Sequence, residues 1–146
     1  FILNVLIFSL LIVIFFYDIR KQIIPDVMVY PLILMGFILQ ARRYYLGLGI
    51  TENIIFAFAI AISFFLLWFF SKGRWMGLGD AKLILATSLL LGFSRALSAS
   101  LFSFWVGAIC VIPLLLAKKA GMSSRVPFGP FIIIGFLISL FYQISF

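Results

Sequence analysis

Charge is scarce in this sequence, and histidine is absent. Of the 146 residues only 10% are charged, with 11 Lys and Arg against 4 Asp and Glu, whereas 66% are hydrophobic. Soluble domains carry about 25% charged residues, so this composition excludes an ordinary soluble domain. With no histidine and a single cysteine, Cys110, the chain lacks the ligands that a zinc site normally needs. This composition effectively excludes zinc chemistry and histidine-based catalysis. The aromatic positions suggest no cofactor site either, so we expect neither a metal nor a cofactor.

The net charge of +7 does not indicate a nucleic-acid-binding protein. The basic residues occur singly and in pairs between apolar runs, rather than together on one polar face. Such a distribution is more typical of loops that orient a membrane protein. We expect membrane lipid, and no nucleic acid, among the partners, while the sequence leaves the oligomeric state open.

Long apolar runs fill most of the chain. Hydropathy predicts spans of roughly 20 residues each, separated by short segments that hold nearly all the charge. The six predicted spans lie at about residues 1–17, 27–45, 53–71, 80–96, 98–117 and 130–146. The fourth leads almost directly into the fifth through Gly92 to Arg95, which suggests a tight helical hairpin. We expect an all-α integral membrane protein, a bundle of about six transmembrane helices in one domain over residues 1–146.

The basic residues are divided unequally between the two sets of connections. Eight belong to the first, third and fifth connections, and three to the second and fourth. In that order they are Arg20, Lys21, Lys72, Arg74, Lys82, Lys118, Lys119 and Arg125, then Arg42, Arg43 and Arg95. By the positive-inside rule the first set is cytoplasmic and both termini lie outside. Asp18, Asp80 and the segment around Pro127 then share the cytoplasmic face.

Two of the four acidic residues lie at the ends of apolar spans. Asp18 closes the first span and Asp80 opens the fourth. Ionisable groups at such positions are costly and are usually kept for function. Two carboxyls at one membrane face can hydrolyse a peptide bond: the ionised one takes a proton from the attacking water, and the protonated one polarises the scissile carbonyl. If the two carboxyls lie close together, they share one proton, so one of them is ionised while the other is protonated.

A structural interpretation of the same two residues is also open. Asp18 and Asp80 can cap helices, or pair with basic residues such as Arg20, Lys21 or Lys82 at the interface. Spacing alone does not choose between these interpretations. Gly77 and Gly79, which precede Asp80, permit close backbone approach beside that carboxylate and favour the functional one.

Three motifs occur in order along the chain. The first runs from Asp18 to Pro25-Asp26, the second is Gly77-Leu78-Gly79-Asp80-Ala81-Lys82-Leu83, and the third is Pro127-Phe128-Gly129-Pro130-Phe131. In these motifs the sequence resembles the type IV prepilin peptidases, membrane aspartyl proteases of the Gly-x-Gly-Asp class. The resemblance extends over residues 18–131, most of the chain.

The resemblance implies a function for the two aspartates. Asp18 and Asp80 would be the catalytic pair, cutting the short basic leader of a prepilin or pseudopilin after a Gly at the cytoplasmic face of the plasma membrane. Many bacterial members also carry an upstream segment with Cys-x-x-Cys pairs and N-methylate the new terminus. No such methyltransferase segment is visible in this sequence, which leaves methylation in doubt.

Other motif residues are expected to shape the site or contact substrate. Asp26 precedes an apolar helix, and we favour a capping role for it over recognition of a basic leader. Lys82 lies roughly 200° around a helix from Asp80 and is expected to reach lipid phosphate instead. Residues 127–130, Pro127, Phe128, Gly129 and Pro130, are expected to form irregular backbone that borders the site and presents groups to an extended substrate.

The three tryptophans, Trp68, Trp75 and Trp105, are expected to be interfacial anchors or lipid-facing residues.

The main alternative function is a small proton-coupled transporter in which Asp18 and Asp80 carry protons. A presenilin-like peptidase with another substrate is a third possibility, against which the Pro127 to Phe131 match argues.

Overall fold

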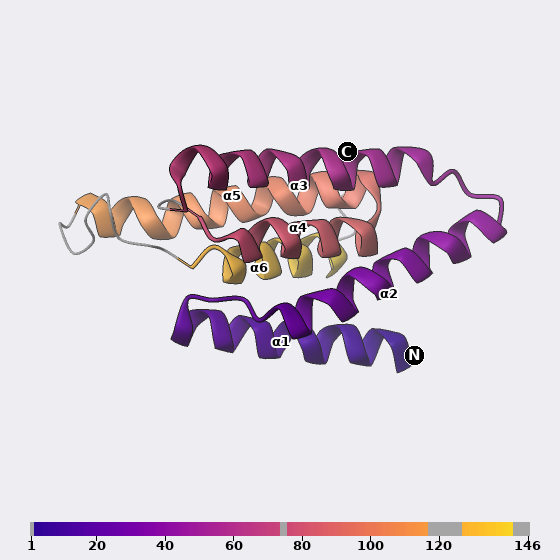
Figure 1. Ribbon diagram of the computed structural model, residues 1–146, viewed down its shortest axis with the longest axis horizontal. Helices are drawn as coiled ribbons and strands as arrows, with labels where there is room; N and C mark the ends of the chain where they lie inside the picture. The colour runs from indigo at the N-terminus through magenta and orange to yellow at the C-terminus, as the bar shows by residue number, and fades with distance from the viewer. Residues whose placement is uncertain (1, 74–75, 117–126, 142–146) are drawn as a thin grey trace.

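The computed structural model describes residues 2–73, 76–116 and 127–141, and for residues 113–116 the backbone alone. All the regular secondary structure of the described residues is α-helical. The helices are, in order, α1 (Ile2–Lys21), α2 (Asp26–Tyr45), α3 (Thr51–Ser71), α4 (Leu78–Leu91), α5 (Phe93–Leu116) and α6 (Gly129–Phe141) (Figure 1). The six predicted spans are confirmed as helices over the residues that the structure describes, and residues 1, 117 and 142–146 of those spans lie outside them. Three of them, α1, α3 and residues 93–112 of α5, are long and apolar enough to cross a membrane. The fold is that of a helical membrane protein.

Helix α4 occupies the centre of the bundle. It packs against α2, α3, α5 and α6, and ten of its 14 residues are buried. At 1.5 Å per residue it is only about 21 Å long, too short to span the roughly 30 Å apolar core of a bilayer alone. Its neighbours enclose it, so α4 does not need the length of a lipid-exposed span.

The predicted hairpin between the fourth and fifth spans is confirmed, but its turn comes earlier than expected. Helix α4 ends at Leu91, and α5 begins at Phe93. The single linking residue, Gly92, has a φ of +82°, a backbone conformation that residues with a side chain rarely adopt. The fourth span therefore ends at this glycine rather than near residue 96.

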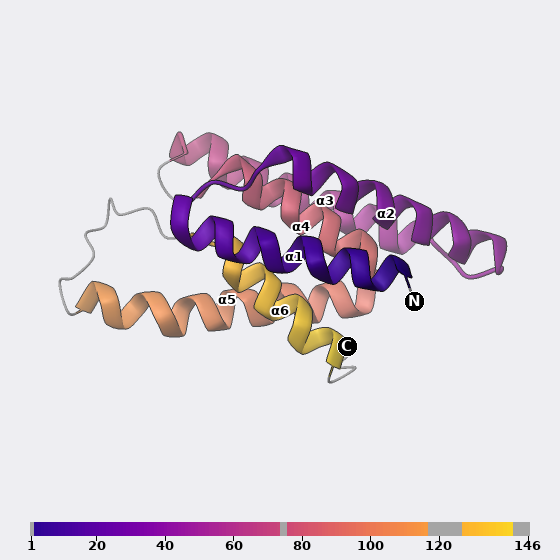
Figure 2. The ribbon, with the colours of Figure 1, turned by 90° about the horizontal axis from the view of Figure 1, so that it is seen from below.

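The ends of the helices gather the three motifs in one place. Helices α1 and α3 end, and α4 and α6 begin, toward the left of Figure 1, whereas the α2–α3 connection and the N-terminus lie at the right. Helix α6 lies between α1 and α5 in Figure 1, and Figure 2 shows it crossing α5 at an angle; it packs against both α1 and α5. Because α6 starts beside the end of α1, the third motif meets the first, as the alternation of spans predicts.

The third motif is more regular than expected. Gly129 and Pro130 form the first residues of α6, and Phe128 caps that helix by accepting hydrogen bonds from the amides of Phe131 and Ile132 at 3.0 and 3.1 Å. The expectation of irregular backbone over residues 127–130 is therefore wrong for Gly129 and Pro130. Proline is tolerated in the first turn of a helix, where its missing N–H has no partner to lose.

Candidate active site

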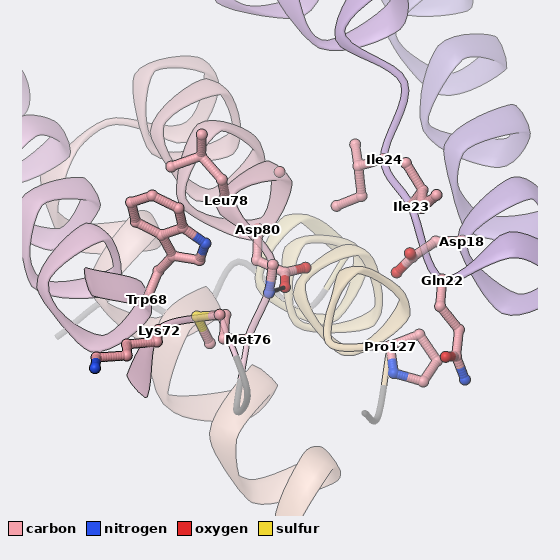
Figure 3. Close-up of a pocket in the computed structure, with 13 residues that line it drawn as sticks. Asp18, Gln22, Ile23, Ile24, Trp68, Lys72, Met76, Leu78, Asp80 and Pro127 are labelled. Atoms are coloured by element: carbon pink, nitrogen blue, oxygen red, sulfur yellow. Dashed lines mark hydrogen bonds between the residues drawn. The ribbon is translucent and has the colours of Figure 1, made fainter. Parts of the chain in front are cut away.

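A pocket of about 390 Å³ opens at the end of the bundle where the motifs meet. It lies between the α1–α2 connection, the α3–α4 connection and the segment before α6. Asp18 and Asp80 both line it, and in Figure 3 their carboxyl groups point toward one another across the start of α6. Two carboxylates far apart in the sequence thus share one cavity.

Asp18 belongs to the buried face of α1. Ile7, Leu11, Ile14 and Asp18 recur at intervals of three and four residues and form the helix face that packs into the protein. The side chain of Asp18 is 3% exposed. Its Oδ2 atom has no hydrogen-bond partner in the described part of the chain. A buried carboxyl oxygen without a partner is costly, which is a common feature of catalytic groups.

Asp80 is positioned by the start of its own helix. It is the third residue of α4, and its Oδ2 accepts a hydrogen bond from the Gly77 amide at 3.0 Å. This contact is half of a capping box, since glycine has no side chain to return the bond. Asp80 therefore does cap a helix, as the structural interpretation proposed, but it also faces the pocket. The two interpretations are compatible for this residue.

The N-terminus of α6 connects the two carboxyls. The backbone amide of Gly129 interacts with both Asp18 and Asp80, and the two carboxyls interact with each other electrostatically. The free amides and positive end of a helix stabilise negative charge. The two carboxyls therefore lie around the positive end of a helix dipole, which lowers the free-energy cost of one negative charge on the pair.

Gly129 has no room for a side chain. A Cβ atom at this position would lie 2.5 Å from Asp18 Oδ2 and 3.1 Å from Ile24 Cδ1. Any larger residue would displace either the carboxyl or the start of α6. Glycine is therefore required for Asp18 to approach the helix end.

Gly79, which lines the pocket, also has no room for a side chain. A Cβ atom there would lie 2.7 Å from the Cβ of Ile24, a residue of the segment that joins α1 to α2. Gly77 differs, because its Cβ would meet only Asp80 Oδ2 at 3.5 Å and its φ of −81° suits any residue. Of the two motif glycines, Gly79 is the one that close packing requires.

Asp26 and Lys82 form an ion pair that the sequence did not predict. The Nζ of Lys82 lies 2.7 and 2.8 Å from the carboxylate oxygens of Asp26 and 3.3 Å from the Tyr30 hydroxyl. Asp26 is the first residue of α2, and the N-cap position before it is held by Pro25, which makes no side-chain capping hydrogen bond. Asp26 does lie in the first turn of α2, at the positive end of the helix, but its carboxylate also pairs with Lys82. Lipid contact by Lys82 stays a prediction. As expected, Lys82 does not contact Asp80.

The residues of the third motif divide between the pocket and the core. Pro127 lines the pocket. Phe128 is not among the pocket residues, and it packs instead in an aromatic cluster with rings from three helices, at centroid distances of 5.5–5.9 Å from Phe64, Phe104 and Phe131. Pro130 is buried. Phe128 therefore fixes the start of α6 rather than facing the cavity.

Several pocket residues were not singled out from the sequence. Gln22 follows α1 with a φ of +53°, and Trp68 and Lys72 come from the end of α3. The remaining newly found members are Ile23, Ile24, Gly73, Met76 and Leu78. Trp68 was expected to be an interfacial anchor, and the structure places it at the pocket (Figure 3). Gln22, Ile23 and Ile24 lie inside the first motif and Leu78 inside the second, but neither charge nor periodicity marks them as pocket residues. The other new members lie outside the three motifs.

The described part of the chain offers no group of three or more His, Cys, Asp or Glu residues that is suited to a metal ion. The pocket contains two carboxylates, an amide and an ammonium group, from Asp18, Asp80, Gln22 and Lys72. A cavity with two adjacent carboxyls and apolar walls is suited to acid–base hydrolysis of a bound peptide.

Comparisons with known proteins agree with the family resemblance found in the sequence. Residues 5–112 match a family model described as the type IV leader peptidase family. The prepilin leader peptidase/N-methyltransferase of Aeromonas salmonicida (strain A449) is 33% identical over 131 residues, covering 87% of this chain and 44% of that protein. The proteins of the same name from Pseudomonas aeruginosa and Legionella pneumophila are 30% and 28% identical, covering 86% and 91% of this chain and 44% and 47% of theirs. The chain thus spans less than half the length of these relatives, and no solved structure matches it.

Proposed function

Because the chain belongs to the type IV leader peptidase family, we propose that it is a membrane aspartic endopeptidase that removes the basic leader of a type IV prepilin or pseudopilin. The observation that carries this proposal is the convergence of two buried carboxyls, Asp18 and Asp80, on one pocket. We treat residues 1–146 as one peptidase domain. The methyltransferase activity named for the relatives is not part of the proposal.

The reaction follows from two carboxyls that share one proton. The ionised carboxyl takes a proton from a water molecule as its oxygen attacks the scissile carbonyl carbon. The protonated carboxyl donates a hydrogen bond to the carbonyl oxygen, which becomes the oxygen of a tetrahedral intermediate. When the C–N bond breaks, a proton passes to the leaving amine, and the products are the leader carboxylate and the new N-terminus. The Gly129 amide stabilises the negative charge left on the pair.

The remaining pocket residues support a peptide as substrate. Ile23, Met76 and Leu78 provide apolar wall, and Gln22 provides an amide that can bond to a peptide backbone. Asp26 is paired with Lys82, so its charge is already balanced and we do not assign it to recognition of the leader. Pro127 borders the cavity and is the residue of the third motif best placed to contact an extended substrate.

We further propose that the pocket faces the cytoplasm and that the protein lies in the plasma membrane. The positive-inside count places the first, third and fifth connections in the cytosol. A substrate with a basic leader and an apolar helix would then reach the site laterally through the bilayer, with its leader on the cytoplasmic side.

The test is cleavage of a purified prepilin-type substrate by this chain in detergent or liposomes, with the cut site located by mass spectrometry. Removal of the leader after a Gly is the expected result. The same liposomes report proton flux through a pH-sensitive dye, and proton-dependent flux without cleavage would favour the transporter. The transporter is the weaker hypothesis because both carboxyls line the same pocket, whereas proton carriers could lie at different depths in the membrane.

A further inference from the structure

A second polar cavity lies at the opposite end of the bundle from the aspartates. It has a volume of about 460 Å³, and its walls come from the end of α2, the start of α3 and the α4–α5 turn. Two arginines, Arg43 and Arg95, line it together with Asn53 and Gly92. Neither arginine has a role in the proposed peptidase reaction.

The two arginines place uncompensated positive charge in this cavity. Arg43 and Arg95 lie close enough to act on one another electrostatically. Arg95 is in the first turn of α5, where the positive end of the helix dipole disfavours a cation. Three sources of positive potential therefore meet at one place.

No carboxylate balances this charge in the part of the chain that the structure describes. The ion pair found there is Lys82 with Asp26, at the other end of α4. Glu52 lies beside Asn53 in the sequence, but it is exposed and forms no ion pair with any residue that the structure describes. The Nη2 of Arg43 donates to the α4 carbonyls of Leu90 and Leu91 at 3.4 and 3.2 Å, which uses only part of its five donors.

We propose that this cavity binds a phosphate oxyanion, and that in the membrane the phosphate belongs to the headgroup of an anionic phospholipid. The guanidinium group presents a planar set of donors that matches phosphate oxygens. The start of α5 adds the positive end of a helix. The cavity lies where helices end and reverse direction, the level at which lipid headgroups meet a membrane protein. The proposal is independent of peptidase activity.

The test compares Arg95→Gln with Arg42→Gln in the purified full chain. Both variants remove one positive charge, but Arg42 is exposed and does not line the cavity. Thermal unfolding in a neutral detergent is followed by tryptophan fluorescence while short-chain phosphatidylglycerol, short-chain phosphatidylcholine or sodium phosphate is added at constant ionic strength. We avoid Arg43 as the main variant because it also holds the end of α4.

We expect phosphatidylglycerol to raise the Tm of the wild type and of Arg42→Gln. The Arg95→Gln variant should need about tenfold more of this lipid for the same rise in Tm. Phosphatidylcholine should cause no such difference between the variants. Competition by sodium phosphate would show that the free oxyanion is sufficient, whereas no effect of phosphate would show that the lipid headgroup is the ligand. Equal titration curves for the two variants, or an equal shift with phosphatidylcholine, would overturn the proposal.

Discussion

Lys82 and Asp26, 56 residues apart, join α4 to α2 through two charged contacts of 2.7 and 2.8 Å. Asp26 opens α2 immediately after the segment that carries Ile24, and Ile24 packs against Gly79. Asp18 lies just before this segment, and Asp80 just after that glycine. We therefore expect the ion pair to help position the two candidate catalytic residues, although it contacts neither of them.

Reversing the charges of this pair tests its positioning role. Asp26→Lys alone places two cations together and is expected to lower leader cleavage about tenfold, because small displacements of catalytic groups are costly. The double variant Asp26→Lys with Lys82→Asp should restore most of the rate. The measurement is kcat and KM for leader cleavage in detergent. Exposed ion pairs contribute only about 0.2–1 kcal/mol to stability, so we expect small changes in Tm.

Glu52→Lys is the matched control for this experiment. Glu52 is also an exposed acid in the first turn of a helix, but it has no ion-pair partner in the described part of the chain. Its reversal should leave cleavage unchanged. If the double variant cleaved the leader no faster than Asp26→Lys alone, the ion pair would not explain the effect of Asp26 on cleavage.

Gly129→Ala is expected to abolish most cleavage while leaving folded protein. The added methyl would lie 2.5 Å from Asp18 Oδ2, so the carboxyl must move away from its partner. We expect kcat to fall about 100-fold, measured with purified enzyme whose fold is checked by thermal unfolding. Gly49→Ala is the control, since a Cβ at Gly49 meets nothing within 4 Å. A fully active Gly129→Ala would contradict the close approach of Asp18 to α6.

Asn53→Ala is expected to weaken the fold rather than the chemistry. The Asn53 side chain donates to Gln40 Oε1 at 3.2 Å and accepts from the Phe93 amide at 2.7 Å, and Gln40 donates in turn to the Leu89 carbonyl at 2.5 Å. Loss of the two Asn53 contacts, which join α3 to α2 and to the start of α5, should cost about 1–3 kcal/mol. Unfolding in detergent measures the loss, with Ser63→Ala at an exposed site on α3 as control. An unchanged midpoint for Asn53→Ala would exclude this network as a source of stability.

Much of the fold and of the carboxylate pair could be predicted from the sequence. The apolar runs define the six helices, and the face formed by Ile7, Leu11 and Ile14 continues to Asp18, which directs that carboxyl into the protein. The partner of Lys82 could not be predicted, because a contact between helices depends on how α2 and α4 pack, and hydropathy does not determine packing. The pocket positions of Gln22 and Trp68 depend on the paths of connections for the same reason. The helical start of α6 was missed because Gly129 and Pro130 usually break helices, except in the first turn.

The most direct test of the account is leader cleavage by Asp18→Asn and Asp80→Asn. Each substitution nearly preserves the shape of the side chain and removes the group that exchanges a proton. With Glu52→Gln as the control for loss of a carboxylate, the account predicts that both aspartate variants fold with a Tm near that of the wild type and yield no cleaved leader, while the control is fully active. Wild-type turnover by either aspartate variant would contradict the two-carboxyl mechanism.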